Sequence, residues 1–332
     1  MRPGCILIES LLMFISLVIP TYHSESYIET TIREIERYVD ESSHDFEIVF
    51  VDDGSLDGTF ERVKVLALAS SLNMKCIQLF MNRGQFHAIM AGIEQARGDY
   101  IVTLDDDLEY HPGQVDRLIE TFEKSAGRLD VVIGVPKDEK RSIHRQFGSW
   151  LKNEMNTIMF NKPRHLRPGC FRMMSAEFAK KLLEFGTANP IIGPLIFKAT
   201  RRIANVTVEH SPGLRTSNYS LGKLITTFLS IIQGFSEFPL RYISMSGLGL
   251  SAFSIMMAGY YMMRHLTGFP RPIKQLGWTS LIVTITFFSG AILFTLGFIG
   301  QYIYKIIEEV NKTPNYQIRS QVDNRDDTDS AS

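Results

Sequence analysis

The chain has 332 residues, a formal net charge of −1 and 45% hydrophobic residues. This length accommodates one soluble domain and further segments, and the near-neutral charge argues against a nucleic-acid partner. The three cysteines, Cys5, Cys76 and Cys170, lack the spacing of a metal site or a disulfide framework, which suits a reducing compartment.

Strand and helix patterns alternate after a short N-terminal extension, expected at residues 1–12. Glu9 interrupts the apolar stretch of this extension, and no cleavage site of a signal peptide follows it. The expected strands are 15–20, 46–51, 74–80, 101–104 and 130–134, and the expected helices are 27–39, 60–69, 85–96 and 115–124. The alternation predicts an α/β fold with a mostly parallel sheet, in which ligands bind beyond the carboxyl ends of the strands.

Two acidic motifs directly follow predicted strands. Asp52 and Asp53 end the second strand, and the run from Asp105 to Glu109 ends the fourth. Carboxylates of the first motif could accept hydrogen bonds from a nucleobase or ribose, and Asp107 could hold Mg²⁺ or Mn²⁺ together with a substrate diphosphate. The structural alternatives are a tight turn that caps a helix in the first motif and a solvated acidic turn in the second.

The last third of the chain has a different composition. Residues 216–240 show the apolar stripe of an amphipathic juxtamembrane helix, which could lie in a membrane interface or pack on the soluble domain. Two nearly uncharged runs at about 243–264 and 278–302 are each long enough to cross a hydrocarbon core of about 30 Å. They predict a transmembrane hairpin within residues 241–306, followed by a tail at 307–332 that is disordered after about residue 319.

The motifs resemble those of family 2 glycosyltransferases with a GT-A fold, a Rossmann-like nucleotide-sugar domain. The matching pieces are Ser16 to Tyr22, Val51 to Thr59, Asn82 to Gln85, Ala96 to Asp99 and Leu104 to Leu108. The second half, with Arg215 to Ser220, Gly277 to Leu281 and Gly297 to Ile303, is similar to the polyprenyl-phosphate branch of that family. This branch contains dolichyl-phosphate mannose synthases, glucosyltransferases of the GtrB type and undecaprenyl-phosphate aminoarabinose transferases.

The resemblance implies a catalytic domain at residues 13–215 and a metal-dependent, inverting transfer of a sugar to a polyprenyl phosphate. The donor would be a nucleotide sugar, with UDP favoured, and the product would serve modification of cell-envelope glycans. The protein would be integral to a membrane, expected to be a bacterial inner membrane, with the catalytic domain and the C-terminal tail in the cytoplasm. Self-association of the chain is left open.

The family's residue roles carry over to positions of this chain. Catalysis is assigned to Asp105, Asp107, Arg141 and Arg145, and the Mg²⁺ or Mn²⁺ ion to Asp107, Asp105 and Glu109. The nucleotide sugar is assigned to Pro20, Tyr22, Glu25, Asp52, Asp53, Asn82, Gly84, Gln85, Asp105 and Asp106. The acceptor phosphate is assigned to Arg141, Arg145, Arg202, His210 and Arg215, for which the alternative is a cationic surface that faces lipid headgroups.

Some positions depart from the pattern of the family. His23, Glu109 and Pro136 stand where relatives carry Asn, Gln and Arg, and the turn from Arg167 to Arg172 lacks an Asp that relatives tend to carry near it. A phosphate monoester acceptor is mostly dianionic at pH 7 and needs little proton removal, so the missing Asp does not exclude catalysis. Two alternatives are a processive polysaccharide synthase, whose Gln-x-x-Arg-Trp motif the chain lacks, and a non-catalytic membrane scaffold with a degenerate transferase domain.

Overall fold

The computed structural model describes residues 12–137, 163, 165–185, 190–211, 213–214, 249, 256, 263, 277–310 and 316–325. The chain divides into two units, Met1–Asn218 with Pro314–Ser332 and Tyr219–Thr313. Three predicted segments lie wholly or mostly outside the described residues: the N-terminal extension, the juxtamembrane helix and the first membrane span.

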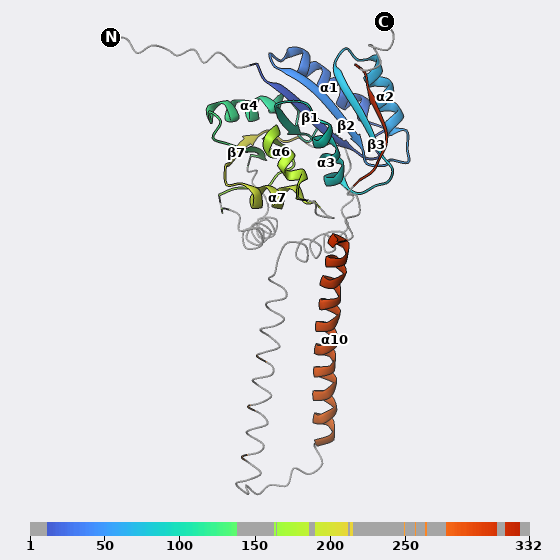
Figure 1. The fold of residues 1–332 in the computed structure, drawn as a ribbon, viewed down its shortest axis with the longest axis vertical. Helices are drawn as coiled ribbons and strands as arrows, with labels where there is room; N and C mark the ends of the chain where they lie inside the picture. The colour runs from blue at the N-terminus through green and yellow to red at the C-terminus, as the bar shows by residue number, and fades with distance from the viewer. Residues whose placement is uncertain are drawn as a thin grey trace, which may run out of the picture. The chain divides into compact units, whose positions relative to one another are not determined.

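The predicted strands and helices up to residue 134 are confirmed to within a few residues (Figure 1). In chain order, the elements are β1 (Phe14–Thr21), α1 (Ile28–Glu41), β2 (Asp45–Asp52), α2 (Thr59–Ala69), β3 (Asn73–Leu79), α3 (Gln85–Gln95), β4 (Tyr100–Thr103), the 3-10 helix η1 (Pro112–Gln114), α4 (Val115–Lys124), β5 (Val131–Pro136), β6 (Arg172–Ser175), α6 (Ala176–Leu183), α7 (Ile192–Ala199), β7 (Ile203–Val208), α10 (Gly277–Val310) and β8 (Ile318–Asp323).

The strands form one sheet in the order β7-β5-β6-β4-β1-β2-β3-β8. β6 and β8 run antiparallel to their neighbours, whereas the other paired strands are parallel, as the alternation of strands and helices predicted. The central strand β1 pairs with β2 on one side and β4 on the other, with Ile15 opposite Phe46 and Tyr100. The loops that follow these three strands therefore leave the sheet at the same edge.

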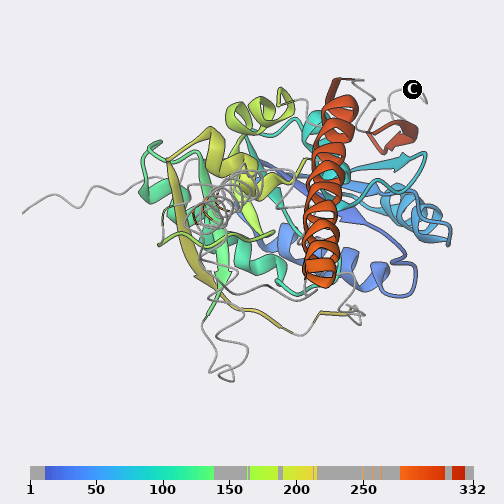
Figure 2. The same ribbon diagram turned by 90° about the horizontal axis from the view of Figure 1, so that it is seen from below.

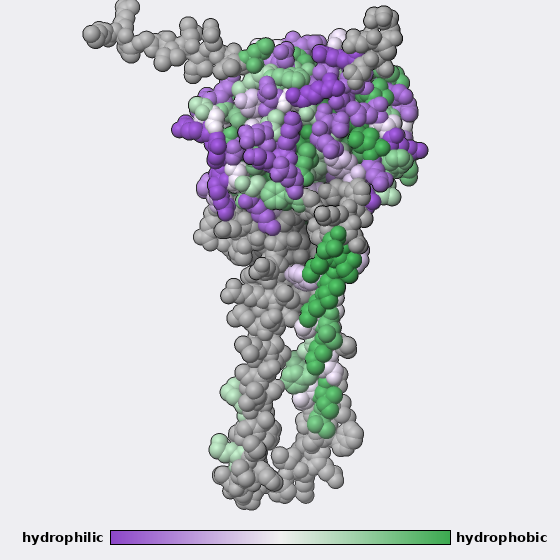
Figure 3. All heavy atoms as spheres, in the orientation of Figure 1, coloured by the Kyte–Doolittle hydropathy of each residue, from purple (hydrophilic) through white to green (hydrophobic). Residues whose placement is uncertain are grey.

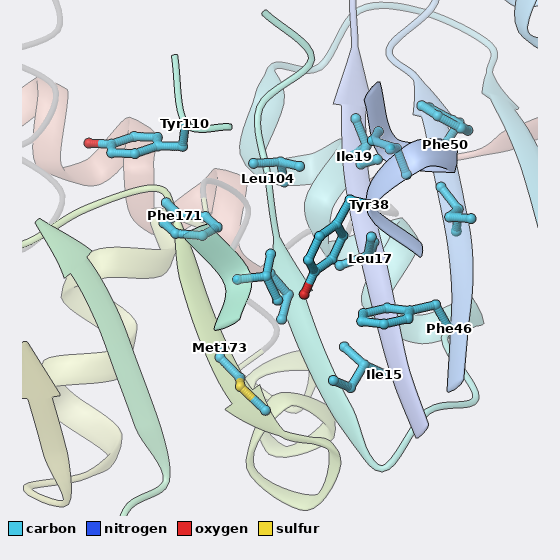
Figure 4. Packing of buried hydrophobic residues seen from close by; sticks show 14 of the residues in the cluster. Ile15, Leu17, Ile19, Tyr38, Phe46, Phe50, Leu104, Tyr110, Phe171 and Met173 are labelled. Atoms are coloured by element: carbon cyan, nitrogen blue, oxygen red, sulfur yellow. The ribbon is translucent and has the colours of Figure 1, made fainter. Parts of the chain in front are cut away.

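Helices cover both faces of the sheet (Figure 2). On one face, side chains of α1, α2 and α4 form the main apolar core with residues of the strands and adjoining loops, such as Leu17, Leu104 and Phe171 (Figure 4). On the other face, α3 lies directly on the strands, because a Cβ atom at Gly92 would come within 2.3 Å of Val18 Cγ1. Burial on both faces accounts for the nearly continuous apolar runs of the central strands.

A buried carboxylate locks the amino edge of the sheet. Glu47 is 2% exposed, and its carboxylate accepts hydrogen bonds from the Ser16 hydroxyl and from the backbone N–H groups of Arg97 and Gly98. A Cβ atom at Gly98 would lie 2.7 Å from Ser16 N, so this turn requires a glycine. The Ala96 to Asp99 motif thus has a structural role at the edge opposite the acidic motifs.

The C-terminal tail corrects one prediction. Disorder was expected after about residue 319, but β8 pairs antiparallel with β3 at the edge of the sheet, with Cys76 opposite Val322. Asp323 Oδ2 lies 2.8 Å from an Arg97 guanidinium nitrogen and 3.7 Å from Lys75 Nζ. The polar composition of the tail by itself indicates disorder. The charged partners of Asp323, Lys75 and Arg97, are distant in the sequence, so the local composition does not reveal them.

The helix α10 contains the second predicted span. Its 34 residues include the stretch Phe287–Tyr304, which has a mean hydropathy of 1.4. Among the described residues this is the helix long and apolar enough to cross a membrane, and side chains such as Ile285 and Leu296 are exposed (Figure 3). The first span stays a prediction.

Candidate functional site

The acidic loop, residues 104–109, begins at the carboxyl end of β4 and is fixed from both sides. The backbone N–H of Leu104 donates to the carbonyl of Val18 on β1 (3.1 Å), and the Thr103 hydroxyl donates to the Cys170 carbonyl (2.6 Å). Leu108 has a left-handed backbone conformation with φ 57°, which is uncommon for a branched side chain. The carboxylates therefore lie on a sharp turn whose position the sheet determines.

Asp105 faces α3 and β6. The side-chain amide of Gln85, the first residue of α3, donates to Asp105 Oδ1, and the Arg172 guanidinium supplies a positive charge nearby. Burial, followed by the charges of Asp107 and Asp106, raises the pKa of Asp105 to about 7, while Arg172 acts in the opposite direction. Asp105 thus changes its charge near neutral pH.

Arg172 is a buried cation behind this carboxylate. It is 1% exposed, its Nε donates to the Cys170 carbonyl (3.1 Å), and its Nη1 has no hydrogen-bond partner in the structure described. Such orphaned buried donors are rare and costly. The negative charge of Asp105 offsets part of that cost.

Asp106 is turned into the protein. It is 5% exposed, and its carboxylate accepts a hydrogen bond from the Ser24 hydroxyl, while its backbone carbonyl accepts one from the Thr31 hydroxyl (2.6 Å). Ser24 also donates its backbone N–H to the Thr59 hydroxyl (2.8 Å). Asp106 therefore joins the acidic loop to the start of α1, and its expected contact with the nucleotide sugar stays a prediction.

Asp107 and Glu109 lie side by side against the segment that follows β7. A Cβ atom at Gly213 would be 3.1 Å from Asp107 Oδ2 and 2.9 Å from Glu109 Cγ, so both carboxylate side chains reach the same glycine. His210 Nε2 lies 3.6 Å from Glu109 Oε2. The structure thus brings two predicted metal ligands and one predicted acceptor ligand together.

The donor atoms of this pair fit a divalent cation. No three His, Cys, Asp or Glu side chains in the described ranges are close enough to form a metal site by themselves. Mg²⁺, however, commonly takes one or two protein carboxylates and completes its coordination with water and substrate phosphates. Asp107 and Glu109 suit that arrangement, and the predicted role of Asp105, whose Oδ1 accepts a hydrogen bond from Gln85, stays a prediction.

The first acidic motif joins the loops after β2 and β3. Asp52 accepts hydrogen bonds from the backbone N–H (3.1 Å) and the hydroxyl of Ser55. These bonds form the tight turn that the sequence offered as the structural alternative to a nucleotide-binding role. Asp53 accepts the backbone N–H groups of Arg83 (2.9 Å) and Gly84 (2.8 Å). Burial raises the pKa of both carboxyls, while these hydrogen bonds act in the opposite direction. Their expected contacts with the nucleoside stay predictions.

The remaining predicted donor contacts gather at the same edge. Pro20 is buried at the end of β1, Tyr22 is half-buried with its ring edge-on to His23, and Asn82 is exposed before α3. Glu25 accepts the backbone N–H of Gly58 (3.0 Å) and so caps the start of α2. The carboxyl ends of β1 to β4 therefore carry the predicted donor residues, but several of their carboxylates already bind backbone N–H groups.

The predicted acceptor residues divide between the two edges of the sheet. Arg202 precedes β7, and its guanidinium donates to the Gly127 and Arg128 carbonyls at the amino edge, away from the acidic loop. His210 follows β7 and lies at the site. Arg141, Arg145 and Arg215 lie outside the described residues, so their roles stay predictions.

Three residues of the site were not predicted: Ser24, Arg172 and Gly213. Arg172 ends the turn that follows Arg167, but its burial depends on the pairing of β6 with β4, which leaves no local pattern. A single glycine carries no signal of the carboxylates that it approaches. Ser24 precedes a helix, where serine is common for local reasons.

Known proteins resemble the chain in sequence. The sequence profile of glycosyl transferase family 2 matches residues 16–183, which are 168 of 332 residues. Undecaprenyl-phosphate 4-deoxy-4-formamido-L-arabinose transferases are similar along most of their length. The one from Edwardsiella ictaluri is 28% identical over 94% of this chain and 95% of its own, and the one from Pseudomonas aeruginosa is 29% identical over 92% and 89%.

A solved structure, glucosyl-3-phosphoglycerate synthase from Mycobacterium tuberculosis with Mn²⁺, UDP and glucosyl-3-phosphoglycerate, aligns with a TM-score of 0.48. It is 19% identical and covers 67% of this chain and 78% of its own. The profile match spans β1 through β6, including both acidic motifs, whereas His210 and Gly213 follow the matched residues. The chain belongs to glycosyl transferase family 2.

Proposed function

We propose that the protein transfers a sugar from a nucleotide sugar, with UDP favoured, to the phosphate of a polyprenyl lipid. The observation that carries the proposal is the pairing of Asp107 and Glu109 at the carboxyl edge of an α/β sheet, where a cation and a diphosphate can be held together. The choice of acceptor is supported by relatives named for undecaprenyl phosphate, whose similarity extends beyond residue 183 over more than nine-tenths of this chain.

The chemistry requires positioning more than proton transfer. An oxygen of the lipid phosphate attacks the anomeric carbon from the side opposite the diphosphate. The bond from that carbon to the diphosphate oxygen breaks, the nucleoside diphosphate leaves with the electron pair, and the configuration inverts. The acceptor oxygen is already anionic near pH 7, so no side chain must act as a strong base.

The residues of the site divide this work. Asp107 and Glu109 hold the cation, Mg²⁺ or Mn²⁺, which when bound supplies positive charge to the departing diphosphate. Gln85 holds the Asp105 carboxylate beside them. His210, next to Glu109, is placed to donate a hydrogen bond to the acceptor phosphate, and Arg141, Arg145 and Arg215 remain candidates for its other oxygens.

The membrane supplies the acceptor. A polyprenyl phosphate presents its headgroup at the bilayer surface, so the enzyme needs a membrane anchor. The apolar stretch Phe287–Tyr304 of α10 suits a membrane span. We assign the catalytic domain and the tail to the cytoplasmic side, where nucleotide sugars are found, in an organism with a polyprenyl-linked cell envelope.

The proposal is tested with the purified full chain, an undecaprenyl phosphate, Mn²⁺ and a panel of nucleotide sugars, with the lipid product identified by mass. We expect one sugar to be transferred, and Asp107→Asn to lower turnover by at least about 100-fold because a cation ligand is lost. Asp45→Asn, an exposed residue at the amino end of β2, is the matched control and keeps full turnover. Equal turnover of the Asp107→Asn and control enzymes would refute the assigned cation site, and absence of any lipid product would refute the acceptor.

A further inference from the structure

A short segment after β7 runs along the acidic loop. We call residues 209–211, 213 and 214 the clasp. The backbone N–H of Ser211 donates to the Glu109 carbonyl (2.9 Å), and the backbone N–H of Leu214 donates to the Asp107 carbonyl (2.7 Å). The clasp therefore holds the backbones of both carboxylate residues of the cation site.

Gly213 lies between these two hydrogen bonds. A Cβ atom there would come within 2.9 Å of Glu109 Cγ and within 3.1 Å of both Asp107 Cγ and Asp107 Oδ2. Gly213 is not among the described glycines with positive φ, which are Gly54, Gly84 and Gly127. An alanine can therefore adopt the backbone conformation, and its methyl group would act by contact alone.

We propose that Gly213 is a positioning residue of the cation site, because its missing side chain leaves the space in which Asp107 and Glu109 lie side by side. This inference rests on the proposed cation-binding role of the two carboxylates. Any side chain at position 213 would push at least one carboxylate away, since the two backbone hydrogen bonds keep the clasp close to the loop. Mutation of residues that orient metal ligands typically weakens metal affinity 10- to 100-fold.

The structural effect of Gly213→Ala should be confined to the cation site. The next residue, Leu214, is 44% exposed, so the clasp is at the surface of the domain, outside the main apolar core. A methyl group at position 213 therefore meets the two carboxylates and leaves the core unchanged. Gly193 in α7 is the matched control, because a Cβ atom there would meet nothing within 4 Å.

The test measures Mn²⁺ binding by the full chain in detergent with saturating UDP, from the electron paramagnetic resonance signal of free Mn²⁺. We expect Gly213→Ala to raise the dissociation constant about tenfold. Gly193→Ala should bind as the unchanged protein does, and neither variant should lower the thermal unfolding midpoint in metal-free buffer. Unchanged Mn²⁺ affinity of folded Gly213→Ala would overturn the inference.

A second arm uses Glu109→Ala, which removes the side-chain atom nearest to the added methyl group. In that background Gly213→Ala should weaken Mn²⁺ binding less than it does alone, because its contact with Glu109 is removed and its contact with Asp107 is kept. An equal effect in both backgrounds would overturn the part of the inference that concerns Glu109. If Gly213→Ala alone fails to fold, we expect the double variant with Glu109→Ala to fold, because the closest contact of the added methyl group is then absent. A double variant that also fails to fold would overturn the inference.

The two proposals fail in different ways. Failure of the unchanged protein to bind Mn²⁺ with UDP would refute the metal part of the proposed function and the role of Gly213 with it. Mn²⁺ binding that is equal in the unchanged and Gly213→Ala proteins would overturn only the role of Gly213.

Discussion

Asp105 combines burial with three carboxylate neighbours, and its pKa is raised to about 7. The pKa of an Asp in an unfolded chain is near 3.9. The folded protein therefore binds this proton more tightly than the unfolded chain does. By linkage, the contribution of Asp105 to stability is fully present below about pH 4 and is lost as the pH rises through about 7.

Asp105→Asn removes this dependence, because the amide cannot ionise while its oxygen can still accept the hydrogen bond from Gln85. In metal-free buffer we expect the variant to be more stable than the unchanged protein by about 1–3 kcal/mol at pH 8, with the difference shrinking as the pH falls toward 4.5. Thermal unfolding midpoints measured across that range check this, with Asp45→Asn as the control. A difference that stays constant with pH would contradict the raised pKa.

The carboxylates also show what residue patterns can and cannot predict. The positions after parallel strands predicted that three carboxylates would lie at one edge of the sheet: those of Asp53, Asp105 and Asp107. The sequence does not predict which of these carboxylates faces a ligand. A carboxylate after a strand has the same local pattern whether it accepts a hydrogen bond from a backbone N–H or contacts a ligand. Asp53 binds the turn before α3, whereas Asp107 reaches Gly213.

At the scale of elements, the strands β1 to β5 were predictable because both faces of the sheet are covered and their sequences are apolar runs. β6, β7 and β8 were not predicted. β6 contains a buried arginine, β7 is polar in its middle at Asn205, and β8 lies at an edge with alternating polar residues. Their pairing depends on partners distant in the chain, such as Lys75 for Asp323, so a local pattern does not indicate it.

β8 is anchored by charge, which gives a prediction at this scale. The Lys75 side chain is 5% exposed, and Asp323 is its carboxylate partner. Asp323→Ala leaves a buried ammonium group without a counter-charge, and we expect a loss of about 3 kcal/mol in the free energy of unfolding. Arg319→Ala, an exposed position on the same strand, should change it by less than about 0.5 kcal/mol. Thermal unfolding of the two variants decides this, and equal midpoints would show that the pair does not anchor β8.

At the scale of the whole molecule, the chain leaves the sheet after β7 and returns to it as β8. Both strands belong to the same eight-stranded sheet, although residues 219–313 form a separate unit between them. A folded sheet lies on one side of a bilayer, so the chain between β7 and β8 must cross a membrane an even number of times. If α10 crosses once, a second crossing must lie between residues 219 and 276, where the sequence predicts the span at 243–264.

The even number of crossings predicts the topology of the connecting residues. With the catalytic domain in the cytoplasm, the C-terminus must be cytoplasmic and the residues between the two spans, about 265–276, must lie on the other side. Green fluorescent protein fused after residue 332 should therefore fluoresce in a bacterial host, and alkaline phosphatase joined after residue 270 should be active. Exchanging the two reporters should silence both, because each works on one side only. A reporter that works at both positions would mean that the chain does not cross the membrane twice between β7 and β8. Active phosphatase at the C-terminus together with a fluorescent protein that works after residue 270 would place the catalytic domain outside the cytoplasm.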